Sequence, residues 1–310
     1  MSYLIENLEC ERSFLRRLWG FWKSLEPVLE PMGFDPHCCW ALIEIDMNDL
    51  APTFKGEVDI LIGRTTFTDQ KQYEAILDGQ IEERKNAHPN ALIQFMNLYN
   101  VAADLVAWNG GLRWPPPTDY LAGVEVKCSR LSLDVDPFDK GIDEGDMKST
   151  KSSRQKVKKI RSEVDKLESL GFDKIALLEV IANPPADGVN LGAWMNASAI
   201  ADKTEQAMER IISNRLPADS IAGHWVLSLG AVAGGDEIMR GSSYPTQYRL
   251  PQKNNFIIGS EVDARRQMME KNITSIFKKL PNPNSLPALY INCRSCRVIH
   301  PCAMNHPCNQ

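Results

Sequence analysis

The stretch that most constrains the fold is LAGVEVKCSR, residues 121–130, in which two charges interrupt an apolar strand pattern. Val124, Val126 and their neighbours favour a pleated, half-buried backbone. Side chains two residues apart on a strand point to the same face, so Glu125 and Lys127 share one face. Burying a carboxylate costs free energy unless a partner or a metal compensates. This strand is therefore either a salt-bridged edge strand or the centre of an active site.

The neighbouring segments indicate an α/β protein. Residues 38–46, 57–63 and 174–183 are apolar strands, and residues 11–30 and 152–172 carry apolar residues at helical spacing. Ser152 or Ser153 is the predicted N-cap of the second helix, and Gly171 its stop. The order is helix, three strands, helix, strand. Further helices are predicted at 69–107, 196–214 and 260–279 and a strand at 224–233, whereas 234–260 is predicted to be irregular.

Composition limits the classes of function. The chain has 310 residues with 43% hydrophobic content, which suffices for one large domain with additions or for two domains. Its net charge of −5 excludes a basic character of the whole chain, so any nucleic-acid surface must be local. No apolar run reaches the length of a membrane span, and the N-terminal residues do not resemble a secretory signal. A cytoplasmic location without membrane contact is therefore expected.

A second carboxylate lies in a similar apolar strand. Asp59 stands in EVDILIG, residues 57–63, and together with Glu125 and Lys127 it would provide the oxygen ligands that Mg²⁺ or Mn²⁺ prefers. A lysine beside the metal can orient the attacking water or neutralise developing charge. This interpretation requires Asp59 to lie beside Glu125 although 66 residues separate them. The alternative first ligand is Asp119, and Glu57 is either an additional ligand or an exposed residue at the start of the strand.

The helix at 152–172 begins in a basic segment that contains no acid between residues 148 and 161. Such a segment is ordinarily a solvated helix face. Beside an acidic metal site it can instead bind phosphates, without reading sequence. The predicted nucleic-acid contacts are Lys151, Arg154, Lys156, Lys158 and Lys159.

These features together resemble the PD-(D/E)XK superfamily of nucleases, which have the restriction-endonuclease-like fold. The resemblance maps the acid of the second strand onto Asp59 and the (D/E)-X-K motif onto Glu125 and Lys127. It implies an αβββαβ core, a mixed central sheet flanked by helices. It also implies a nuclease domain over residues 1–233 with a helical insertion at 64–118.

The same resemblance implies residues on the two helices of the core. Gln155 is the first choice for the residue on the helix after the motif strand, with Lys156 or Lys158 as alternatives. Glu26 or Glu30 would supply a glutamate on the first helix.

The function implied is that of a Mg²⁺- or Mn²⁺-dependent deoxyribonuclease, the effector of a bacterial phage-defence or DNA-processing complex. Its partners would be DNA and a helicase or other ATPase, and a homo-oligomer is compatible with this role. The alternative is a non-catalytic subunit that binds nucleic acid or protein and retains the nuclease-like fold.

A cysteine-rich element, residues 293–308, ends a predicted C-terminal extension over 234–310. Its sequence CRSCRVIHPCAMNHPC has the spacing of a structural zinc site. The predicted ligands are Cys293, Cys296, Cys302 and Cys308, and His300 or His306 can replace one of them. The first three cysteines also resemble the iron–sulfur branch of the same superfamily, in which Cys10, Cys38 or Cys39 would complete a cluster. Cys128 is interpreted as a small buried hydrophobic residue.

Overall fold

The computed structural model describes residues 14–16, 18, 22–37, 39–64, 115–130, 150–182, 215–229, 231–234, 237–240, 245–281, 287–293 and 296–302. The side chains of residues 129–130, 150–158, 182, 229 and 231–240 are not part of this description. The helices predicted at 69–107 and 196–214 lie outside the described residues.

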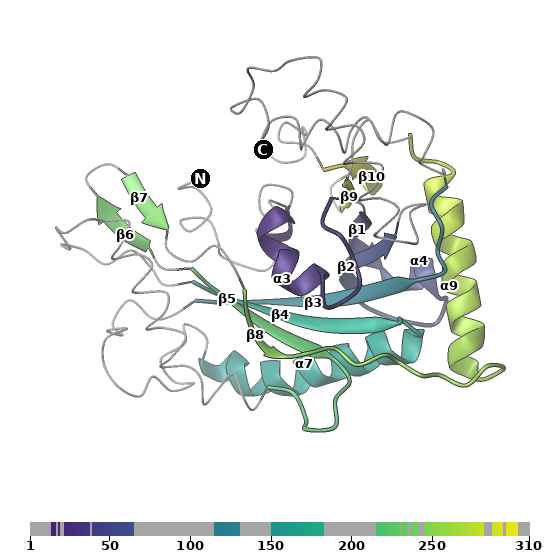
Figure 1. The fold of residues 1–310 in the computed structure, drawn as a ribbon, viewed down its shortest axis with the longest axis horizontal. Helices are drawn as coiled ribbons and strands as arrows, with labels where there is room; N and C mark the ends of the chain where they lie inside the picture. The colour runs from purple at the N-terminus through teal and green to yellow at the C-terminus, as the bar shows by residue number, and fades with distance from the viewer. Residues whose placement is uncertain are drawn as a thin grey trace, which may run out of the picture.

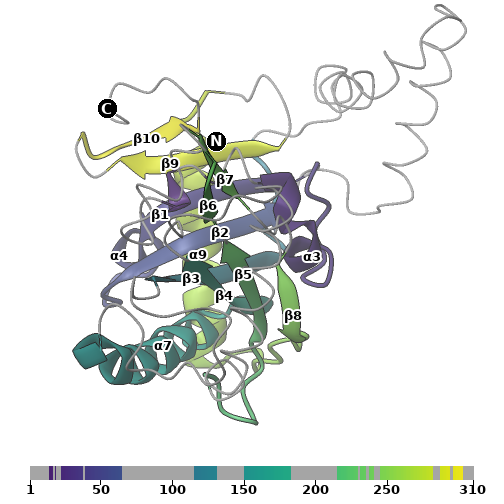
Figure 2. The ribbon, with the colours of Figure 1, turned by 90° about the vertical axis from the view of Figure 1, so that its left-hand side faces the viewer.

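The main sheet has eight strands in the order β10-β9-β1-β2-β3-β4-β5-β8 (Figure 2). Its strands are β1 Cys39–Asp46, β2 Glu57–Arg64, β3 Leu121–Arg130, β4 Lys174–Ala182, β5 Gly223–Leu229, β8 Thr246–Arg249, β9 Ala288–Cys293 and β10 Val298–Pro301. A separate two-stranded sheet pairs β6 (Ala231–Gly234) with β7 (Glu237–Arg240). The predicted strands 38–46, 57–63, 121–130 and 174–183 are confirmed, whereas the predicted strand 224–233 is divided between β5 and β6.

The sheet is mixed, as expected. β1, β2 and β3 pair antiparallel, whereas β3, β4 and β5 pair parallel, with α7 (Thr150–Leu170) between β3 and β4 in the chain. Near the other edge, β9 pairs parallel with β1. The predicted C-terminal extension therefore contributes β8, β9 and β10 to the main sheet.

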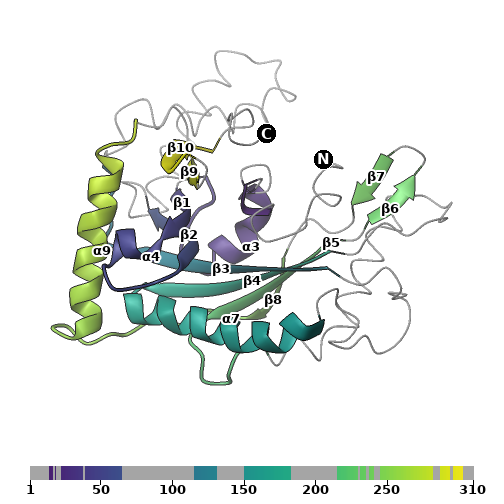
Figure 3. The same cartoon turned by 180° about the vertical axis from the view of Figure 1, so that it is seen from behind.

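Helices cover both faces of the sheet. α3 (Glu26–Leu29), which follows the short 3₁₀ helix η2 (Trp22–Leu25), lies on one face, and α7 lies on the other (Figures 1 and 3). α4 (Met47–Leu50) follows β1, and α9 (Glu261–Phe277) stands at the end of the sheet where β3 begins. The predicted helix 11–30 is shorter than expected in its described part, where Pro27 lies in the first turn of α3. None of the described helices is both long and apolar enough to cross a membrane.

Two hydrophobic clusters, one on each face of the sheet, form the core. The first cluster joins η2 and α3 to one face of the strands, through residues such as Leu25, Val124 and Val126. The second cluster joins α7 and α9 to the other face, through residues such as Val164 and Phe277. Alternation along β3 therefore sends Val124 and Val126 to the first cluster and the intervening side chains toward α7.

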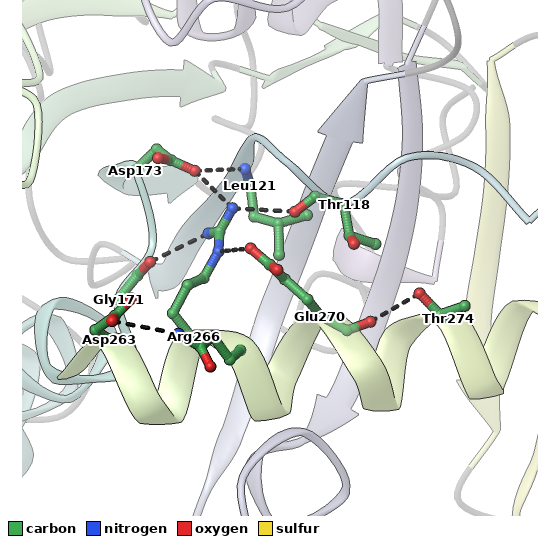
Figure 4. A network of polar contacts seen from close by, with 9 residues as sticks. Thr118, Leu121, Gly171, Asp173, Asp263, Arg266, Glu270 and Thr274 are labelled. Carbon is green, nitrogen blue, oxygen red and sulfur yellow. Dashed lines mark hydrogen bonds and ion pairs between the residues drawn. The ribbon is translucent and has the colours of Figure 1, made fainter. Parts of the chain in front are cut away.

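Arg266 of α9 fastens this helix to the amino-terminal ends of β3 and β4 (Figure 4). Its guanidinium group lies 2.9 Å from Asp173 Oδ2 and 2.6 Å from Glu270 Oε1, and it donates to the carbonyl oxygens of Gly171 and Thr118. Asp173 Oδ2 also accepts the backbone N–H of Leu121. Arg266 is 4% exposed, so most of its donors are satisfied inside the protein.

Arg266→Met is expected to destabilise the protein by about 3 kcal/mol, because it leaves Asp173 and two carbonyl groups without their buried partner. Thermal unfolding should show a fall in Tm of about 5 °C or more. The matched control is Arg265→Met, since Arg265 pairs with Glu261, whose side chain is 87% exposed. The control should cost less than about 1 kcal/mol. Equal losses in the two variants would contradict this account of Arg266.

Candidate active site

The candidate site lies on the face of the sheet that α7 covers. Glu125 and Lys127 alternate with Val124 and Val126 of the first cluster, so they point toward α7. Both are buried, with 2% and 8% of their surfaces exposed. β3 is also the fifth strand of eight, between β2 and β4. The charged pair therefore does not belong to a solvated edge strand.

Asp59 of β2 meets this pair. Its Oδ2 accepts the backbone N–H of Val126 at 2.7 Å and lies 4.0 Å from Lys127 Nζ. Asp59 is 6% exposed. The structure therefore brings together Asp59, Glu125 and Lys127, across the interval of 66 residues that separates Asp59 from Glu125 in the sequence. Antiparallel pairing of β2 with β3 explains the proximity, since Ile60 pairs with Val124.

The alternative ligand Asp119 lies elsewhere. It is exposed and precedes the first residue of β3, Leu121. Leu121 is already about 13 Å from Glu125 along the strand at the usual rise per residue. Asp59, not Asp119, is therefore the acid beside Glu125.

Lys127 is held by two carboxylates. Its Nζ forms an ion pair with Glu125 Oε1, and it lies 3.3 Å from Glu163 Oε2 of α7. It also donates to the Val126 carbonyl at 3.0 Å. Glu163 Oε2 is buried and makes no hydrogen bond, so its approach to Lys127 is an electrostatic contact. The ammonium group therefore lies among Asp59, Glu125 and Glu163.

Glu163 is a site residue that the sequence analysis missed. It follows the basic segment of α7 and sits beside the apolar stripe formed by Ile160, Val164 and Leu167. Its Oε1 lies 3.0 Å from Lys159, one turn earlier on the helix. The sequence does contain an acid beside the apolar stripe of α7. The spacing of the stripe alone, however, does not predict that this acid reaches Lys127.

Burial governs the protonation of this group. Burial is the largest influence raising the pKa of Glu125 well above its ordinary value, and the charges of Asp59 and Glu163 act in the same direction against Lys127. Burial also acts to raise the pKa of Glu163. There, Lys127 and hydrogen bonds with Glu125 and Lys159 outweigh burial, so the pKa of Glu163 lies below its ordinary value. Of the two carboxyl groups, Glu125 is therefore the one that binds a proton more readily than Glu163 does.

A further acid lies in β1. Glu44 is 4% exposed and falls between the paired residues Ile43–Ile60 and Ile45–Val58, which places it across from Asp59. Its φ of +56° is left-handed, a conformation that costs a residue with a Cβ about 1–2 kcal/mol. The distortion reverses the alternation of β1, because Ile43 packs in the first cluster and Ile45 in the second. Strain of this kind is often found at functional sites.

A second polar cluster continues the site across β4 and β5. Glu179 is the neighbour of Lys127 in the parallel register of β3 and β4. Its Oε1 lies 2.8 Å from His224 Nε2 of β5, and its Oε2 accepts from Arg215 Nε at 2.9 Å. All three residues are at most 4% exposed. Sequence reasoning missed them, although Glu179 interrupts an apolar strand as Glu125 does.

The other predicted site residues either have side chains that are not described or lie away from Glu125. Gln155, Lys151, Arg154, Lys156 and Lys158 belong to α7, but their side chains are outside the described part. Lys159 is exposed and pairs with Glu163. Glu26 and Glu30 are exposed at α3, on the face of the sheet opposite to Glu125, so the structure does not bring them to the site. Glu57 is half-buried and pairs with Asp46 in the β1–β2 register.

The donor set suits a hard divalent cation, although the ligands are not yet arranged around one. Asp59 and Glu125 offer carboxylate oxygens with little competing solvent. However, no group of three or more histidine, cysteine, aspartate or glutamate side chains in the described ranges is arranged to hold an ion. In this arrangement the ammonium group of Lys127 occupies the position beside Glu125.

Three of the predicted zinc ligands lie in or next to the hairpin of β9 and β10, and β9 is three strands away from β3 in the main sheet. Cys293 is buried, Cys296 exposed and Cys302 half-buried, and none of these three forms a disulfide. Cys308 lies outside the described residues, as do Cys10 and Cys38 of the iron–sulfur alternative. Cys39 is buried in the first cluster, where burial raises the pKa of its thiol and disfavours the thiolate that a metal binds. Cys128 packs against the same cluster, which agrees with its interpretation as a small hydrophobic residue.

Comparison with known proteins adds no relative: no protein-family model matches the chain, and neither the curated proteins nor the solved structures gave a significant match.

Glu125→Gln is expected to stabilise the protein at pH 8 by about 1 kcal/mol, because it removes a buried charge. The folded pKa of Glu125 is raised, so the folded protein binds this proton more tightly than the unfolded chain does. Wild-type stability therefore falls as pH rises from the unfolded pKa through the folded pKa. Thermal unfolding in the presence of a chelator should show the gain at pH 8 and none near pH 4. A variant less stable than the wild type at pH 8 would contradict this, and Glu261→Gln is the exposed control.

Proposed function

We propose that this protein is a metal-dependent nuclease that hydrolyses DNA phosphodiester bonds on a restriction-endonuclease-like core. The observation that carries the proposal is the meeting of Asp59 and Glu125, from neighbouring strands, at the ammonium group of Lys127. The order of the described elements also supports it, since α3, β1, β2, β3, α7 and β4 occur in this order as helix, three strands, helix, strand, with only the one-turn helix α4 added among the described residues between β1 and β2.

The position of the cluster in the sheet fits a site for an elongated substrate. β3, β4 and β5 run parallel, and Lys127 and Glu179 each stand three residues before the last residue of their strands. Ligands of parallel sheets usually bind beyond the carboxyl ends of the strands. A phosphodiester backbone crossing these ends would pass close to both residues.

Asp59 and Glu125 would hold Mg²⁺ or Mn²⁺. When bound, the cation would supply a Lewis acid for the phosphoryl oxygen and lower the pKa of a coordinated water. Lys127 would carry a fixed positive charge beside the negative charge that develops at the phosphate. Glu163 positions this ammonium group from the helix side, since it lies 3.3 Å away. Lys127 would thus add a positive charge of the chain itself to that of the bound metal ion.

The basic start of α7 would bind the DNA backbone. Lys151, Arg154, Lys156, Lys158 and Lys159 are distributed over its first ten residues. Contacts with phosphates contribute affinity that weakens as salt rises but carry no sequence information. A partner such as a helicase or another ATPase, in a bacterial phage-defence or DNA-processing complex, would then supply specificity, and assembly as a homo-oligomer is compatible with this role.

A second candidate is a non-catalytic subunit that binds nucleic acid or protein. It is favoured by the ion pairing of Lys127 with Glu125 and Glu163, which satisfies the cluster without a metal. In this case the charges of Lys127, Glu125 and Glu163 would serve the fold alone. Changing them would affect stability, and the protein would cleave no DNA with or without the change.

Asp59→Asn and Lys127→Met are each expected to lower kcat for DNA cleavage by about 10²–10³-fold, because the first removes a charged metal ligand and the second removes the positive charge beside the reacting phosphate. The assay uses plasmid and linear DNA with Mg²⁺, with Mn²⁺ or with a chelator, and the chelator should abolish cleavage. The Kd for DNA should stay within about threefold of the wild type, since the binding residues are elsewhere.

The controls for these variants are Asp165→Asn and Lys166→Met on the outer side of α7. Asp165 is exposed, and Lys166 donates to the Lys55 carbonyl oxygen in the loop before β2. Both controls should cleave like the wild type. Cleavage that persists in Asp59→Asn and Lys127→Met would exclude this site as the nuclease centre.

A further inference from the structure

The β9–β10 hairpin separates two of the predicted zinc ligands. Cys293 pairs with Val298, and the ladder continues to Cys302, whose backbone N–H donates to the Leu289 carbonyl at 2.7 Å. Cys302 therefore lies four residues from Cys293 along the hairpin, about 13 Å at the usual strand rise. Two thiolates on one zinc ion can be no more than about 4.6 Å apart, since each Zn–S bond is about 2.3 Å. Cys293 and Cys302 cannot share one ion in this register.

In the same register a histidine, rather than Cys302, lies next to a cysteine of the C-x-x-C motif. Cys296 Sγ lies 2.9 Å from His300 Nε2, and both side chains are accessible at the turn end of the hairpin. His300 pairs with Ile291, so it shares a face with Cys293 and is its diagonal neighbour. A thiol and an imidazole in contact are two ligands of the kind that zinc prefers.

The turn brings Cys293 close to this pair. Arg297 N–H donates to the Cys293 carbonyl at 2.6 Å, and Arg297 has a left-handed φ of +55°. The two cysteines of the C-x-x-C motif therefore stand at the same end of the hairpin. Across the described ranges no three such side chains converge on one point, so the Cys293 side chain has to rotate toward Cys296 when an ion binds.

Cys302 has a different environment. It is half-buried and packs against the first hydrophobic cluster, together with Leu289 and Tyr120. Its position is that of a small apolar residue that covers the core at the sheet edge.

We propose that the hairpin binds a structural zinc ion through Cys293, Cys296 and His300, and that Cys302 is not a ligand. The fourth position is open to water. The ion links the ends of β9 and β10, the outermost pair of strands at this side of the main sheet. The proposal is independent of nuclease activity, because this hairpin contributes no residue to the acidic site.

The test is the metal content of the purified full chain and its variants, measured by mass spectrometry after removal of any tag. The wild type and Cys302→Ser should each carry about one zinc per chain. Cys296→Ser and His300→Ala should lose at least about four fifths of it, since removing one of three ligands weakens a site of this kind strongly. Zinc retained by His300→Ala but lost from Cys302→Ser would overturn the proposal. A wild type without zinc, or one with the visible absorbance of an iron–sulfur cluster, would overturn it as well.

A second variant separates direct ligation from a structural effect of His300. His300→Cys keeps a zinc ligand at the same place, so it should retain about one metal per chain. With Co²⁺ in place of zinc, it should absorb more strongly in the thiolate-to-metal charge-transfer region than the wild type does. Loss of metal from this variant, or an unchanged spectrum, would show that His300 does not bind the ion.

Discussion

The ammonium group of Lys127 is the interaction on which the candidate site depends. Asp59, Glu125 and Glu163 surround it between the sheet and α7, and without it their negative charges would repel one another with less compensation. Replacement of buried ion pairs by apolar residues of similar volume is often neutral or stabilising, because desolvation of the charges offsets much of the free energy of their pairing. The cluster is therefore poorly explained by stability alone, which is why we attribute it to function.

Acids recur along the central strands in a band. Glu44 in β1, Asp59 in β2, Glu125 in β3 and Glu179 in β4 are all buried, and each interrupts an apolar strand. The opposite ends of β3 and β4 hold the Arg266 network, in which every charge has a partner and α9 is fixed in place. The two ends of β3 and β4 therefore have different roles. The amino-terminal ends hold α9 against the sheet, whereas the opposite ends carry more acidic than basic side chains.

The parts of the structure that follow from local pattern could be predicted. Alternation in β3 places Glu125 and Lys127 on one face, and the apolar stripe of α7 predicts its buried side, ending at Gly171. Asp59 could be predicted only as a member of a second apolar strand, and its place beside Val126 comes from the β2–β3 register. Glu163, Arg215 and His224 depend on how α7 and the strands pack, which the spacing of one segment does not determine. The β9–β10 hairpin, which separates Cys302 from Cys293 along the ladder, was not predicted, because Pro301 and the short strands conceal the period-two pattern.

The parallel pairing of β9 with β1 has a consequence for synthesis of the chain. Trp40 pairs with Ala288, so 248 residues must be made before β1 acquires its neighbour on that side. During this time β1, whose first seven residues are buried in the finished protein, exposes an open row of backbone donors and acceptors. Such long-range pairing is slow and leaves the nascent chain prone to association. Completion of the main sheet therefore has to wait for the synthesis of β9 and β10, and not for that of the strands that carry the acidic site.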